Sequence, residues 1–147
     1  MAAVDTNVLV RYVVQDDAAQ GAAAARLIGR SVQAGTPLFV PVTVLLELEW
    51  VLRSAFGFDK AEVLGVLSRL LGSFELSFES EGAVEAALAK YERGSADFAD
   101  CLHAALAQQA NQPPLWTFDK AAARVDGARL LTGSSRSSLP SKSCIYL

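Results

Sequence analysis

The chain contains few of the residues that build disulfide scaffolds or zinc sites. Its 147 residues include only two cysteines, Cys101 and Cys144, and one histidine, His103. Two cysteines are too few for a disulfide framework, which favours a reducing cytoplasm as the compartment. These three residues also lack the spacing of a Cys–His zinc site. The sequence therefore predicts an intracellular protein without structural zinc.

Long hydrophobic runs, a signal peptide and a basic charge balance are also missing. The longest apolar candidate, 38–52, is interrupted by Pro41, Glu47 and Glu49, so no membrane span is expected. The first residues carry no basic region of the kind that opens a signal peptide. The net charge of −3 disfavours general binding to nucleic acid through a basic surface. It does not exclude a nuclease, because bound cations reverse the field of an acidic site.

The composition is that of one compact domain, with 52% hydrophobic and 20% charged residues. We expect residues 1–132 to form this domain and the serine-rich residues 133–147 to be an exposed tail or an addition for expression. Short apolar strands alternate with helices, which predicts an α/β fold with a parallel sheet of about four to five strands between helices. The expected strands are 2–4, 37–41, 74–78, 114–118 and 128–131. The expected helix caps are Asp16 or Asp17, Thr43, Asp59 and Ser95.

Acidic residues follow two of the predicted strands. Asp5 ends the first and Asp119 ends the fourth, and the carboxyl ends of parallel strands form the edge at which ligands bind. Glu47 and Glu49 lie on one predicted helix about 200° apart, so they cannot both face one site. We expect Glu47 beside the buried stripe and Glu49 toward solvent or toward Arg53 at i+4.

Asp97 and Asp100 are three residues apart and share a helix face. Asp97 has two interpretations, a helix cap or a site residue, whereas Asp100 precedes an apolar stretch and is expected beside the core. A group of carboxylates at one sheet edge is stable when divalent cations neutralise it, and oxygen ligands suit Mg²⁺ or Mn²⁺. Two such ions can hold the attacking and leaving oxygens of a phosphodiester. The residues therefore predict metal-assisted phosphoryl chemistry.

Four stretches resemble, in order and spacing, the PIN-domain ribonucleases, and specifically the VapC-type toxins of bacterial toxin–antitoxin pairs. They are "DTNVLVRY", "PVTVLLELEWVLR", "YERGSADFADCLHAALA" and "TFDKAA", and the resemblance covers residues 1–131. It implies the family's parallel sheet between helices. Its acidic catalytic site falls on Asp5, Glu47, Asp100 and Asp119. It also implies metal binding by Asp5, Asp97, Asp100 and Asp119, with Thr6 and Asn7 supporting the first aspartate and Thr117 the last.

The resemblance further implies an endoribonuclease that uses one or two Mg²⁺ or Mn²⁺ ions to hydrolyse RNA, with transfer RNA or a ribosomal RNA loop as substrate. A cognate VapB antitoxin would inhibit it, the toxin would form a homodimer, and the compartment would be the bacterial cytoplasm. Arg11, Arg53 and Arg93 are candidates for contact with RNA phosphates.

Two other functions stay open from the sequence. A PIN domain can bind RNA or a partner without catalysis, although all four expected carboxylates are present here. A phosphatase of the haloacid dehalogenase type also begins with an aspartate after its first strand. Such enzymes need a second aspartate two residues later, where this chain has Asn7.

Overall fold

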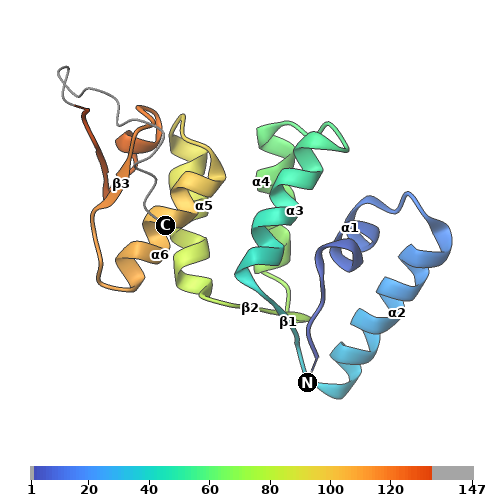
Figure 1. Ribbon diagram of the computed structural model, residues 1–147. Helices are drawn as coiled ribbons and strands as arrows, with labels where there is room; N and C mark the ends of the chain where they lie inside the picture. Colours follow the sequence, from blue (N-terminus) through green and yellow to red (C-terminus); the bar gives the residue numbers. More distant parts are fainter. Residues whose placement is uncertain (1, 134–147) are drawn as a thin grey trace, which may run out of the picture.

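The computed structural model describes residues 2–133 and contains helices and short strands in alternation (Figure 1). The predicted tail of residues 133–147 lies outside the described residues, apart from Gly133. In chain order the elements are α1 (Thr6–Val14), α2 (Ala18–Ala34), β1 (Leu38–Val40), α3 (Val42–Ser54), α4 (Lys60–Leu71), β2 (Leu76–Phe78), α5 (Glu81–Arg93), α6 (Phe98–Gln109), β3 (Leu115–Thr117), the 3₁₀ helix η1 (Ala122–Arg124) and β4 (Ala128–Leu130).

Aspartate side chains begin three of the described helices. Asp5, Asp17 and Asp59 each accept a hydrogen bond from the backbone N–H three residues further on. Such a cap satisfies a donor that the first helical turn leaves without a partner, and it is typically worth about 1 kcal/mol. The predicted caps at Asp17 and Asp59 are confirmed. Asp5, at the end of the predicted first strand, is the N-cap of α1.

The predicted caps at Thr43 and Ser95 are wrong. Helix α3 begins directly after Pro41, which makes no side-chain cap bond. Helix α6 begins after Asp97 rather than after the serine. Proline fixes its own φ near the helical value, and the Glu79 carboxylate, which follows β2, accepts a hydrogen bond from the Val42 N–H at the start of α3 at 2.8 Å. Among the described residues, no helix combines the length and apolar character needed to cross a membrane.

Every strand pair is parallel, as the predicted α/β class requires. Strand β1 pairs with β2, and β3 pairs with β4, where Trp116 lies opposite Arg129. The predicted first strand contributes a single bridge, from Ala3 to Phe39. It goes no further because Asp5 already caps α1. Within residues 2–133 the strands thus form two small sheets rather than one sheet of four to five.

Helices α3 and α4 stand in the middle of the molecule, with α1 and α2 on one side and α5 and α6 on the other (Figure 1). One apolar core includes side chains from all of these helices, and α2 contributes the least to it. Burying one leucine or phenylalanine side chain contributes about 1.5–3 kcal/mol. The largest fully buried apolar side chains are Phe98, Leu9, Leu45, Leu48, Leu52, Leu67 and Leu102.

Candidate active site

The first candidate carboxylate, Asp5, lies at the junction between Val4 and α1. Its Oδ1 accepts a hydrogen bond from the Val8 N–H at 3.0 Å, and the side chain is exposed. Its neighbour Asn7 is exposed too, and both residues line a hollow between α1 and α2. The helix cap fixes the Asp5 carboxylate through one oxygen and leaves the group at the surface.

Thr6 connects α1 to the second candidate carboxylate. The Thr6 hydroxyl is buried and donates a hydrogen bond to Oε1 of Glu47, which lies on α3, 41 residues further along the chain. Thr6 therefore reaches Glu47, whereas the resemblance assigned it to the support of Asp5. Through this contact Asp5, Thr6 and Glu47 form one group at the α1–α3 junction.

Asp97, Asp100 and Asp119 form a second group, between the start of α6 and the end of β3. Burial raises the pKa of Asp100, and the negative charges of Asp97 and Asp119 raise it further, against a smaller opposing effect of His103. Like charges interact in this way only when they are near one another. The structure thus brings Asp119 to the helix that carries Asp97 and Asp100, although they are far apart in sequence.

Asp119 is held in a tight turn after β3. Its Oδ1 accepts hydrogen bonds from the N–H groups of Ala121 at 2.7 Å and Ala122 at 3.2 Å. The Asp119 N–H in turn donates to the Thr117 hydroxyl at 3.0 Å. Thr117 is therefore in contact with the backbone of Asp119, which is the supporting position that the sequence resemblance implied.

All of these candidates supply oxygen ligands, which are the ligands that Mg²⁺ and Mn²⁺ take. The mutual repulsion around Asp100 is the electrostatic condition that a bound cation relieves. Within residues 2–133, however, no three acidic, histidine or cysteine side chains lie close enough together to hold one ion. The residue types fit a divalent metal, and the structure arranges them as the two groups described above.

Glu49 does not face solvent, which corrects one of the two positions expected for it. It is 2% exposed, whereas Glu47 is exposed. Arg53 pairs with it as predicted, through Nε to Oε1 at 2.7 Å and Nη2 to Oε2 at 3.1 Å. The side of α3 that carries Glu49 packs into the core along with Leu45, Leu48 and Leu52.

The Glu49–Arg53 pair lies beside the second carboxylate group. The hydrogen bond that Arg53 donates to Glu49 is the main cause of the raised pKa of Arg53, and the charge of Asp97 also contributes. Burial raises the pKa of Tyr91, followed by the charge of Glu49. Lys60 lies over the Tyr91 ring and donates to the Gly94 carbonyl at 2.8 Å. These contacts join α3, α4 and α5 to the segment that leads to Asp97.

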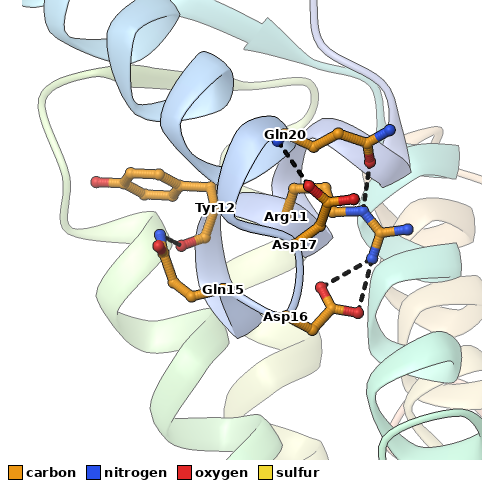
Figure 2. Close-up of polar contacts among 6 residues, drawn as sticks. All are labelled: Arg11, Tyr12, Gln15, Asp16, Asp17 and Gln20. Atoms are coloured by element: carbon orange, nitrogen blue, oxygen red, sulfur yellow. Dashed lines mark hydrogen bonds and ion pairs between the residues drawn. The ribbon is translucent and has the colours of Figure 1, made fainter.

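Two of the three arginines considered for RNA contact are held by intramolecular bonds. Arg11 binds both carboxylate oxygens of Asp16 at 2.8 and 2.9 Å and donates through Nε to Gln20 at 2.7 Å (Figure 2). Arg53 donates to the two carboxylate oxygens of Glu49 through two different nitrogens, Nε and Nη2. Arg93 is exposed at the end of α5. The geometry leaves Arg93 as the candidate best placed to meet a phosphate.

The pKa of Asp100 predicts a pH dependence for the stability of the metal-free protein. The folded pKa lies above the ordinary value of 3.8. The folded protein therefore binds this proton more tightly than the unfolded chain, and stability falls as the pH rises through the folded pKa. The Asp100→Asn variant does not lose this stability, because asparagine does not ionise. The difference in melting temperature between the variant and the native protein should therefore rise by about 1–2 °C from acidic to neutral pH, given a like-charge cost of about 0.5 kcal/mol. Thermal melts of both proteins in EDTA measure it, and a difference that is constant with pH contradicts it.

Comparison with known proteins adds one finding. The family model of the PIN domain matches residues 2–128. No curated protein matches the chain.

Proposed function

Because the chain belongs to the PIN-domain family, we propose that it is a divalent-metal-dependent endoribonuclease and the toxin of a VapC-type toxin–antitoxin pair. The observation that carries this proposal is the match to the PIN domain over residues 2–128, within which Asp97 and Asp100 lie at the start of α6 and Asp119 lies in the turn after β3. The negative charges near Asp100 oppose its ionisation, and a bound cation would relieve this repulsion.

The carboxylates have distinct parts in the proposed reaction. Asp5, Asp100 and Asp119, with Asp97 beside them, would hold one or two Mg²⁺ or Mn²⁺ ions. When bound, such an ion neutralises charge on the scissile phosphate and makes water a stronger nucleophile. Glu47, oriented by the Thr6 hydroxyl on Oε1, has its second oxygen available to accept the proton of the attacking water. Attack at phosphorus then breaks the P–O bond to the leaving nucleotide.

The proposed substrate is a single-stranded or looped region of transfer or ribosomal RNA, where the backbone is accessible. The proposed regulator is a VapB-type antitoxin, and the proposed assembly of the toxin is a homodimer in the bacterial cytoplasm. These assignments are supported by the likeness of four separate stretches to VapC-type toxins, within a chain that matches the PIN domain over residues 2–128.

The direct test is cleavage of total bacterial RNA by the purified protein, freed of any antitoxin. We expect discrete new 5′ ends with Mg²⁺ or Mn²⁺ and none with EDTA. Mapping those ends identifies the RNA and the position of the cut. A folded, antitoxin-free preparation that gives no metal-dependent ends contradicts the nuclease assignment.

The second candidate is a PIN domain that binds RNA or a protein without cutting. It is favoured by the absence, within residues 2–133, of three acidic, histidine or cysteine side chains close enough to hold an ion. RNA binding that persists in EDTA, together with no cleavage in any metal, supports this candidate. The haloacid dehalogenase alternative has no support from the family match, and a phosphatase assay on the same preparation tests it.

A further inference from the structure

A basic hollow adjoins the second carboxylate group. It has a volume of about 200 Å³ and lies between the end of α5, the segment 94–96 and the residues 121–126 around η1. Its charged lining consists of Lys90, Arg93 and Arg124, with Asp126 as the single acidic residue. The chain as a whole carries a net charge of −3, so this local excess of two positive charges departs from the average surface.

The hollow is lined by segments that continue into two of the proposed site residues, Asp97 and Asp119. Ser95 and Ala96 line it and lead directly into Asp97. On the opposite side, Ala121 lines it, and the N–H of Ala121 donates to Oδ1 of Asp119 at 2.7 Å. The lining of the hollow therefore comes within one residue of Asp97 and within two residues of Asp119 along the chain.

The three basic side chains that line the hollow differ in their contacts. Lys90 Nζ donates to the backbone carbonyl of Asp126 at 3.0 Å, which fixes its charge at the wall. Arg93 and Arg124 are exposed. The ion pairs found among residues 2–133 involve other arginines, Arg11 and Arg53. Two guanidinium groups that form no ion pair with the part of the chain that the structure describes can both donate to the oxygens of one phosphate.

The volume of the hollow restricts the class of ligand that it can hold. Pockets for drug-sized molecules measure about 300–1,000 Å³, so about 200 Å³ suits a small anionic group rather than a nucleoside. The lining contains no aromatic side chain on which a base could stack. A phosphodiester group fits this size and this charge.

We propose that the hollow binds a backbone phosphate of the RNA, next to the phosphate that is cut. The proposal rests on the proposed nuclease function and adds a subsite to it. Contacts to the phosphate backbone position a nucleic acid without reading its sequence. Arg93 and Arg124 are thus expected to set RNA affinity and register, while the carboxylates carry the chemistry.

The test compares Arg93→Gln, Arg124→Gln and the double variant with the native protein. Gln retains the aliphatic stem, and both positions are exposed, so folding is expected to persist. The matched control is Arg26→Gln with Arg30→Gln, two exposed arginines on α2. Binding of a single-stranded RNA oligonucleotide is measured in EDTA by fluorescence anisotropy over a series of KCl concentrations, with inorganic phosphate alone as a second probe.

We expect the double variant to bind RNA about tenfold more weakly and to lose about 0.7 from the slope of log Kd against log salt, which is the contribution of one neutralised phosphate of a single strand. In cleavage assays KM should rise by a similar factor, with kcat and Mn²⁺ affinity unchanged. An unchanged salt slope overturns the proposal. An equal loss in the α2 control also overturns it, because net charge alone would then explain the effect.

Two further outcomes are informative. Reduced Mn²⁺ affinity in the double variant would assign the arginines to the metal site and overturn the phosphate subsite. Binding of inorganic phosphate that depends on Arg93 and Arg124, with RNA binding unaffected, would mean an adventitious ion only. Because the binding assay contains no metal, a native protein that binds RNA but never cleaves it refutes the nuclease function while leaving this test of the hollow valid.

Discussion

Asp5→Asn is expected to lower metal-dependent RNA cleavage by about 10³-fold while leaving the fold intact. A divalent ion contributes several kcal/mol of transition-state stabilisation. Loss of about 4 kcal/mol corresponds to a factor of about 10³, since each 1.36 kcal/mol changes a rate tenfold. The rate of appearance of the mapped 5′ ends, at saturating Mg²⁺, measures the effect.

The substitution is informative because Asn preserves the structural role of Asp5. The Val8 N–H donates to Oδ1 of Asp5, and asparagine offers the same oxygen and caps helices about as well as aspartate. Only the charge and the second carboxylate oxygen are lost. An unchanged melting temperature would therefore assign the loss of activity to the site rather than to α1.

Asp17→Asn is the matched control for this experiment. Asp17 caps α2 as Asp5 caps α1, by accepting from the Gln20 N–H at 2.9 Å. The chemical change is identical, and the residue belongs to neither carboxylate group. We expect native activity from Asp17→Asn. If Asp5→Asn cleaves RNA as fast as this control, Asp5 has no part in the mechanism.

Local signals in the sequence were sufficient for much of the fold. Asp17 and Asp59 were predicted as caps because capping depends on contacts within one helical turn. The central residues of four strands were predicted correctly from short apolar runs bounded by turn residues. The division into two sheets could not be predicted, since it depends on contacts between elements that are far apart in the sequence.

Strand order did not predict how the site residues are grouped. Strand order predicted that Asp119 would lie at one sheet edge with Asp5, but β3 belongs to a separate sheet from β1 and β2, and Asp119 instead acts on Asp100 of α6. The burial of Glu49 was missed because α3 is apolar on most sides, so periodicity alone does not reveal which glutamate faces the core. The basic hollow was missed because Arg93 and Arg124 come from separate elements.

The Glu49–Arg53 pair predicts unequal costs for the loss of its two members. Arg53→Met leaves the carboxylate of Glu49, 2% exposed, without its positively charged partner, and breaking a buried ion pair in this way costs about 3–5 kcal/mol. This corresponds to a fall in melting temperature of about 10 °C for a domain of this size. Glu49→Gln leaves Arg53, whose side chain is 38% exposed and can be hydrated, so its cost should be about 1–2 kcal/mol. Urea unfolding and thermal melts in EDTA measure both.

The double variant Glu49→Leu with Arg53→Met decides between two explanations of that instability. If the cost comes from burying an unpaired charge, removing both members should restore most of the native stability, because an apolar pair of similar volume replaces a buried ion pair with little loss. If the ion pair itself stabilises the protein, the double variant should be at least as unstable as Arg53→Met. Arg30→Met, at an exposed position on α2, controls for the general effect of replacing an arginine. Since Asp97 acts electrostatically on both Arg53 and Tyr91, restored stability with weakened Mn²⁺ binding would further show that the pair serves to place Asp97 rather than to hold the fold together.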